Sequence, residues 1–179
     1  GSVARKVVRE CRCTVRVARP AVAAASSPVR ILVGHDGETG GRAALREAAS
    51  RDWVDGSELI VLTAWMPAAV TVFSGEPPWH VGWPVPEAPR ERRAVLSTVE
   101  EDAEAVRRVG LAVTTVTRAG DATRVLLRSA RTWKVDAVFV GATSMSRLER
   151  FVLGSVSAAV SGRAPCSVEV VRAPARPAP

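Results

Sequence analysis

Short apolar runs alternate with amphipathic segments along the chain from Val29 onward. The runs are rich in β-branched residues, which is typical of buried strands, and the apolar positions between them recur at helical spacing. Five strands are predicted, in the sequences VRILVG, SELIVLTAW, LAVTTVTR, VDAVFVG and CSVEVVR. Because helices separate the strands, the pattern predicts an α/β fold, with a parallel sheet covered by helices on both faces.

The predicted helices have apolar stripes and recognisable ends. The stripe of the first helix after Val29 consists of Ala44, Leu45, Ala48 and Ala49. The stripe of the helix before the third strand consists of Val95, Leu96, Val99, Ala103 and Val106. Such spacing marks one helical face. Gly110 is expected to end that helix, and Asp121 is expected to be the N-cap of the next one.

Two terminal segments lie outside this alternation. Residues 1–28 are predicted to form a basic arm and linker, residues 29–173 the α/β domain, and residues 174–179 a Pro-rich tail that cannot pair inside a sheet. From Cys11 to Val17, small apolar residues alternate with polar ones, the pattern of a strand with one charged face. Such a strand would cover a sheet edge or contact a neighbouring subunit, and both alternatives stay open. We expect the domain to fold without the arm.

The positive charge of the chain is concentrated in the arm. The formal net charge is +7, from 25 Lys+Arg and 18 Asp+Glu. Residues 1–30 contain seven basic residues and one acidic residue, which leaves 18 basic and 17 acidic residues over 31–179. Nucleic-acid binding by the nearly neutral domain is not expected, since it depends on neutralising phosphates. The arm would suit an acidic partner, and no apolar run is long enough to span a bilayer.

Three cysteines occur in the chain, Cys11, Cys13 and Cys166. They do not form a disulfide framework, and this usage predicts a reducing, cytoplasmic location. Cys11-x-Cys13 has the spacing of half a metal site, but no further Cys or His lies nearby in the sequence. The two residues are therefore interpreted as small apolar residues of the arm strand, and no metal site is predicted.

Ligands of open parallel sheets bind beyond the carboxyl ends of the strands. Gly34, His35 and Asp36 follow the first predicted strand, Ala64 and Trp65 end the second, and residues 141–144 follow the fourth. His35 and Asp36 are adjacent, and adjacent side chains usually point apart. They are interpreted as loop residues rather than as an acid–base pair.

Familiar catalytic and phosphate motifs are missing. The chain has no P-loop G-x-x-x-x-G-K-[ST], no dinucleotide fingerprint G-x-G-x-x-G and no nucleophile elbow G-x-S-x-G. The stretch VFVGATSMSRLERFVLGSVSAAV is a different phosphate-site candidate. A glycine such as Gly141 lets the backbone approach an anion, and a helix that starts at Gly154-Ser155 attracts negative charge. The same spacing also fits a plain strand-to-helix connection.

The chain from about Val29 to Arg172 resembles a universal stress protein domain, a stress-response and regulatory module. The similarity lies in RILVGHDGETGGRAAL, in RAGDATRVLLRSA, and most clearly in VFVGATSMSRLERFVLGSVSAAV with APCSVEVVR. The resemblance implies an open five-stranded parallel sheet of strand order 3-2-1-4-5, of the adenine nucleotide alpha hydrolase-like type. It also implies a homodimer through the last strand and, in one subgroup, bound ATP.

Nucleotide-binding members of this family carry G-x2-G-x9-G-[ST], and Ser144 replaces the second glycine here. Carried over, the resemblance places Asp36, Gly34 and His35 at the ribose or adenine and Ala64 against the adenine. The ribose and phosphates would be held by Val140, Gly141, Ser144, Gly154, Ser155 and Val156. Participation of Mg²⁺ with the ATP stays open.

Ser144 leaves two alternatives for function. Serine is small and donates hydrogen bonds, so ATP binding is expected to be retained; the alternative is a nucleotide-free interaction scaffold of the same fold, because a second subgroup lacks the motif. No general base or nucleophile can be assigned, so an efficient enzyme is not expected, while slow ATP hydrolysis or autophosphorylation stays open. An adenylate-transferring enzyme is not expected, since a pyrophosphate loop such as S-G-G-x-D is missing.

Two expectations concern surfaces. The last strand is predicted to leave an exposed edge, which predicts a homodimer through residues 166–172. The Trp/Pro-rich segment 65–86 is interpreted as a lid on the sheet, with a partner-binding or adenine-covering flap as the alternative.

Overall fold

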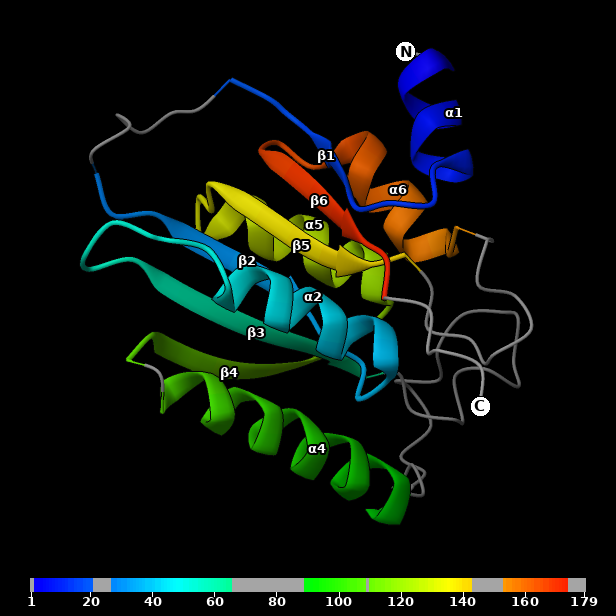
Figure 1. Cartoon of the computed structure of the whole chain (residues 1–179). Coiled ribbons are helices and arrows are strands. Elements are labelled where there is room, and N and C mark those ends of the chain that lie inside the picture. The colour runs from blue at the N-terminus through cyan, green and yellow to red at the C-terminus, as the bar shows by residue number, and fades with distance from the viewer. Residues whose placement is uncertain (1, 21–26, 66–88, 109, 143–152, 174–179) are drawn as a thin grey trace, which may run out of the picture.

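The computed structural model describes residues 2–20, 27–65, 89–108, 110–142 and 153–173. Its centre is a six-stranded sheet of order β1-β6-β5-β2-β3-β4 (Figure 1). The strands are β1 (Val15–Val17), β2 (Arg30–Gly34), β3 (Glu58–Trp65), β4 (Ala112–Ala119), β5 (Ala137–Gly141) and β6 (Ser167–Val171).

The five predicted strands are all present and parallel, and their order β4-β3-β2-β5-β6 confirms the expected 3-2-1-4-5 arrangement. The structure differs from the prediction by a sixth strand. β1 comes from the arm and pairs antiparallel with β6, with Val15 opposite Val170 and Val17 opposite Val168. The arm therefore extends the sheet of the domain.

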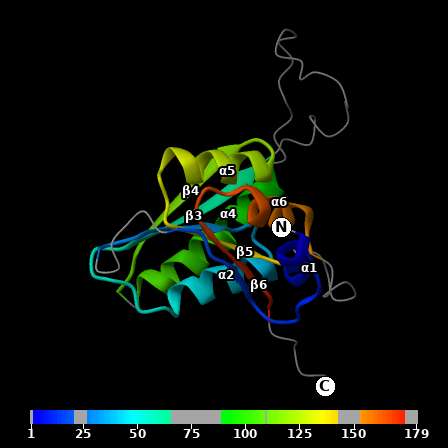
Figure 2. The same ribbon diagram turned by 90° about the horizontal axis from the view of Figure 1, so that it is seen from above.

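Helices cover both faces of this sheet. They are α1 (Ser2–Glu10), α2 (Thr39–Ala49), α4 (Pro89–Arg107), α5 (Ala122–Thr132) and α6 (Ser155–Arg163). Ile31 and Val33 of β2 pack in the core layer beneath α2 and α4, whereas Leu32 packs in the layer that contains α5 and α6. Figure 2 shows α2 and α5 on opposite sides of the sheet.

The predicted helix stripes and ends are mostly confirmed. Ala44, Leu45 and Ala48 are buried, as are Val99, Ala103 and Val106, while Ala49, Val95 and Leu96 are only partly buried. Asp121 caps α5 by accepting a hydrogen bond from the backbone N–H of Arg124 at 2.9 Å. Gly110 follows α4 with a φ of +92°, a left-handed conformation that favours glycine.

The arm differs from its predicted form. Its first residues form α1, which was not predicted, and its strand covers only Val15–Val17. Cys11 and Cys13 lie in the turn between these elements, so their interpretation as strand residues is wrong. α1 lies beside α6 (Figures 1 and 2), and Val8 is only 3% exposed and belongs to the core.

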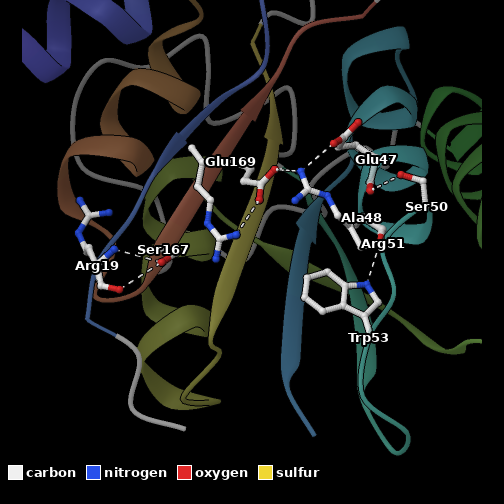
Figure 3. Close-up of polar contacts among 9 residues, drawn as sticks. Arg19, Glu47, Ala48, Ser50, Arg51, Trp53, Ser167 and Glu169 are labelled. Carbon is white, nitrogen blue, oxygen red and sulfur yellow. Dashed lines mark hydrogen bonds and ion pairs between the residues drawn. The ribbon is translucent and has the colours of Figure 1, made fainter. Parts of the chain in front are cut away.

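Arginines fasten the arm to the domain. The backbone N–H of Arg19 donates to Ser167 Oγ at 3.1 Å, and its guanidinium donates to the carbonyls of Cys166 at 3.0 Å and Ser161 at 2.7 Å. Arg19 and Ser167 are shown in Figure 3. From the domain, Arg172 Nη2 donates to the carbonyls of two residues of α1, Val8 and Arg9.

The edge of β6 is therefore not exposed. The predicted exposed edge, from which pairing with a second copy was expected, is wrong in this structure. All five residues of β6 are buried, including Glu169, which is 2% exposed. The Glu169 carboxylate contacts Arg51 Nη2 at 2.6 Å (Figure 3) and Arg16 Nη1 of β1 at 3.7 Å. One basic residue of the arm, Arg16, is thus paired with a carboxylate of the same chain.

Part of the predicted picture lies outside the described residues. Ser144 belongs to this part, as do Trp79, Trp83 and all of the predicted lid after Trp65. Among the described helices, none is both long enough and apolar enough to cross a membrane.

Candidate functional site

A cleft opens at the carboxyl ends of the central strands. β2 lies between β3 and β5, so the chain leaves β2 on one side and later returns on the other. Such a switch in strand order is where open α/β sheets bind ligands. The wall of the cleft comes from the ends of β2, β3 and β5 and from the starts of α5 and α6.

The structure brings nine of the ten predicted site residues to this cleft, and Ser144 lies outside the described residues. The nine are Gly34, His35, Asp36, Ala64, Val140, Gly141, Gly154, Ser155 and Val156. They come from chain segments more than 100 residues apart, so their convergence is a consequence of the topology.

The start of α6 faces the cleft without a side-chain cap. Gly154 is its N-cap residue, with φ −63° and ψ 151°, and among the described residues no side chain caps this helix start. The neighbouring α5 has its first turn capped by the carboxylate of Asp121. Uncapped N–H groups and the helix dipole favour an anionic ligand, so α6 supplies the anion-attracting end of the cleft.

Two hydrogen bonds hold the start of α6 to the end of β5. The backbone N–H of Gly154 donates to the carbonyl of Ala142 at 2.7 Å, and Ser157 Oγ donates to the same carbonyl at 2.9 Å. The hydroxyl of Ser157 is engaged in this contact, so the Ser157 side chain positions the helix. The N-terminal N–H groups of α6 are thereby placed at a defined distance from Gly141.

Gly141 has a packing role that the sequence did not predict. A Cβ on Gly141 would lie 2.5 Å from the carbonyl carbon of Gly40 and 2.6 Å from its oxygen. No side chain fits there without moving the first turn of α2. Packing of β5 against α2 therefore requires the glycine.

His35 is a buried residue whose ring contacts α4. Its Nδ1 accepts from the backbone N–H of Gly37 at 2.9 Å, so Nε2 carries the proton and donates to Asp102 Oδ2 at 3.2 Å. Arg42 Nε donates to the same carboxylate. Burial lowers the pKa of His35 below its usual value, against the opposing charge of Asp102. The carboxylate beside the ring is Asp102, which agrees with the interpretation that His35 and Asp36 are not an acid–base pair.

Asp36 is the exposed carboxylate of the cleft wall. Its Oδ1 accepts from the backbone N–H of Glu38 at 3.1 Å, which leaves further lone pairs for a ligand. None of the described residues that line the cleft is a lysine or an arginine. Within the described wall, attraction for an anion therefore comes from backbone N–H groups.

Sequence reasoning missed several wall residues, namely Gly41, Leu62, Ala122, Leu126, Ala142 and Ser157. The sequence did contain a signal for the α5 residues. Gly120 and Asp121 follow β4 and precede α5, so this is a strand end like those of β2, β3 and β5, where ligand residues were expected. Leu126 was interpreted only as a helix residue. Its exposure to the cleft depends on how α5 packs, which the sequence does not specify.

The cleft combines three surfaces of different chemistry. Leu62, Ala64, Leu126 and Val140 give an apolar wall, Asp36 gives hydrogen-bond acceptors, and α6 gives donors. The volume of this open cleft is about 140 Å³, below the roughly 300–1,000 Å³ of typical ligand pockets. The described residues therefore surround only part of a ligand larger than this space.

Comparisons with known proteins agree with this architecture. The family model described as "Universal stress protein family" matches residues 29–172. The structure of universal stress protein UspA from Lactobacillus plantarum is 21% identical with a TM-score of 0.55, and the alignment covers 80% of this chain and 97% of that one. No curated protein is similar enough to the chain to count as a match.

Two further structures were solved with nucleotides. A universal stress protein in complex with cAMP is 23% identical with a TM-score of 0.56, over 83% of this chain and 100% of that one. A universal stress protein family protein from Arabidopsis thaliana with AMP bound is 14% identical with a TM-score of 0.54, over 85% and 97%. At these identities the likeness shows the fold, while the family model covers 144 of the 179 residues (29–172). The chain belongs to the universal stress protein family.

Proposed function

We propose that the cleft binds an adenine nucleotide, ATP in particular, and that the protein is a nucleotide-dependent stress-response module. The observation that carries the proposal is the uncapped start of α6, which faces the cleft from Gly154 onward. A phosphate is the anion that such a helix end suits best. The family membership and the relatives described with cAMP and AMP support the choice of adenine.

Each part of the nucleotide has a matching surface in the proposal. Ala64 and the leucines of the apolar wall would contact the adenine. Asp36 would accept hydrogen bonds from the ribose hydroxyls. Ser155 and Val156 would donate their backbone N–H groups to the phosphates, and Mg²⁺ would bind with the ATP without a protein ligand from the described wall.

The affinity should be modest because no basic side chain lines the described part of the cleft. We expect a micromolar Kd, on the order of −8 kcal/mol. Ser144 completes the site in the proposal, since a serine hydroxyl donates to a phosphate as a backbone amide does. Both ring nitrogens of the buried His35 are in hydrogen bonds, with Gly37 and with Asp102, so His35 is not assigned as a base. Slow ATP hydrolysis or autophosphorylation stays open.

Assembly and location complete the proposal. A homodimer through residues 166–172 needs the edge of β6, and that edge is paired with β1. One edge pairs with one strand at a time, so the dimer belongs to a form of the chain in which the arm has left β6. The proposed location is the cytoplasm, because the three cysteines form no disulfide framework.

The test is mass spectrometry of the full chain, purified gently and sprayed under native conditions. The proposal predicts a fraction of protein that carries one adenine nucleotide per chain, and its mass distinguishes ATP from AMP and cAMP. A protein that stays free of nucleotide even after incubation with millimolar ATP would support the nucleotide-free scaffold instead.

A further inference from the structure

Two thiols meet in the turn between α1 and β1. Cys11 Sγ lies 3.2 Å from Cys13 Sγ, because the chain bends at Arg12 and Cys13. Cys13 is exposed and Cys11 is partly exposed. The pair lies outside residues 29–172, which match the family, and far from the nucleotide cleft in the sequence.

The two thiols are not equivalent. The hydrogen bond between the two sulfurs lowers the pKa of Cys11 and raises the pKa of Cys13. Because the thiolate is the nucleophilic form of cysteine, the direction of these shifts favours Cys11 as the thiol that attacks first. Cys13 keeps its proton longer and is placed to react second.

The charges near the pair also favour a thiolate at Cys11. Cys11 follows the last residue of α1, and its N–H donates to the carbonyl of Val7 at 2.9 Å. A helix C-terminus alone would disfavour an anion. Here the guanidinium of Arg172 binds the carbonyls of Val8 and Arg9 at that end, and its positive charge acts on both thiols in the favourable direction.

Cys166 provides an internal contrast. It is 8% exposed and lies in the core layer beside α5 and α6. Burial raises the pKa of Cys166, so it should stay a thiol and react slowly. Reactivity is therefore expected at one pair of cysteines and not at the third.

We propose that Cys11 and Cys13 form a redox-active dithiol that exchanges with low-molecular-weight disulfides. The Cys11 thiolate attacks one sulfur of the small disulfide, forms a mixed disulfide and releases one small thiolate. The Cys13 thiol then loses its proton to solvent and attacks Cys11 Sγ, which forms the Cys11–Cys13 disulfide and releases the second small thiol. Two protein thiols are oxidised and one small disulfide is reduced to two thiols.

The geometry suits the second step. A disulfide bond needs its sulfur atoms about 2.05 Å apart, so the two Sγ atoms must approach by roughly 1 Å from their 3.2 Å separation. A turn at the surface accommodates this shift without disturbing the core. Metal binding is the less favoured use of the pair, because no group of three or more His, Cys, Asp or Glu side chains within the described residues could hold an ion.

The dithiol is tested on the reduced full chain with oxidised glutathione as the probe. After alkylation of the remaining thiols and digestion, the peptide with Cys11 and Cys13 should have lost two hydrogen atoms and carry neither glutathione nor the alkylating group. Cys166 should be alkylated only after unfolding. The variant Cys166→Ser should give the same result, which serves as the matched control.

Two single variants test whether the internal disulfide needs both thiols. Cys13→Ser should stop at a glutathione adduct on Cys11, because the resolving thiol is gone. Cys11→Ser should likewise stop at an adduct on Cys13, because Cys11 no longer raises the pKa of Cys13 and no second thiol is left to resolve the adduct. The proposal is overturned if the native chain ends with glutathione on both cysteines or with disulfides between chains. Glutathione found first on Cys13 when the native chain is quenched early would overturn the assigned roles as well.

Discussion

A Cβ on Gly141 would come within 2.5 Å of the carbonyl carbon of Gly40, so the end of β5 and the first turn of α2 touch through backbone atoms. Gly141→Ala is therefore expected to destabilise the domain, by roughly 1–3 kcal/mol, through a shift of α2. Chemical denaturation measures this loss directly. Any loss of nucleotide binding in this variant would follow from the damaged fold.

Gly162→Ala is the matched control for this prediction. Nothing lies within 4 Å of a Cβ at Gly162, which is exposed in α6. Alanine in a helix is favoured over glycine by about 0.5–1 kcal/mol, so this variant should be as stable as the native chain or slightly more stable. Equal destabilisation at both positions would contradict the close contact between Gly141 and Gly40.

The layered parallel sheet could be predicted because it depends on periodic apolar positions, whereas its strand order was implied by the family resemblance. Ile31, Leu32 and Val33 alternate between two core layers as a strand buried on both faces must. The position of Asp36, Ala64 and Gly154 at one cleft could be predicted as well. Ligands of open α/β sheets bind beyond the carboxyl ends of the strands, and this depends only on topology.

Tertiary contacts decided the features that sequence reasoning missed. The apolar residues of β1 suit an edge strand wherever it pairs, and only the structure shows that its partner is β6. Glu169 interrupts an apolar strand, and its burial depends on Arg51 and Arg16 from distant segments. The glycine at position 141 is explained by a backbone contact with α2, a cause that no spacing rule contains.

Arg19 is expected to be the main anchor of the arm. Arg19→Ala removes two guanidinium hydrogen bonds, a change of roughly 1–3 kcal/mol for bonds from a charged donor. Hydrogen exchange should then show faster exchange of the β6 amides that face β1. Arg5→Ala, at an exposed position of α1, should leave exchange in β6 unchanged. Equal protection in both variants would show that Arg19 does not hold the arm.

Removal of residues 1–28 tests the arm and the proposed dimer together. The remaining domain should unfold cooperatively, because both core layers are formed mainly by residues after Val29. It should also associate into dimers in sedimentation, since the edge of β6 is then free to pair. Loss of cooperative unfolding would show that the arm belongs to the folding unit, and a strictly monomeric domain would contradict the dimer through residues 166–172.

His35 should make the protein less stable in mild acid. Its pKa is lowered in the folded state by burial, so the unfolded chain binds the proton more readily. The stabilising contribution is therefore complete above the ordinary pKa of about 6.5 and is lost as the pH falls through the folded pKa. Urea unfolding at pH 7.5 and pH 5.5 should show this loss in the native chain and a weaker pH dependence in His35→Gln. An unchanged slope in the variant would contradict it.

Glu169 should have the opposite dependence on pH. Burial raises the pKa of Glu169 above its usual value, although Arg51 and Arg16 oppose the shift. Its contribution is therefore fully present below the unfolded pKa and lost as the pH rises through the folded pKa. Glu169→Gln should cost more stability at pH 4.5 than at pH 7.5, because the amide stays neutral at both. A larger cost at pH 7.5 would mean that the ion pairs outweigh the burial of the charge.

Calorimetric titration with ATP and Mg²⁺ tests the proposed nucleotide site most directly. The native chain and Gly162→Ala should bind with micromolar Kd. Gly154→Val should not bind, because its side chain stands at the start of α6 where the phosphates would lie, and its thermal unfolding should stay close to that of the native chain. Ser144→Gly should bind equally well or several-fold more tightly. Absence of heat at millimolar ATP in both the native chain and Ser144→Gly would contradict the account, and the cleft would then be an empty feature of the fold.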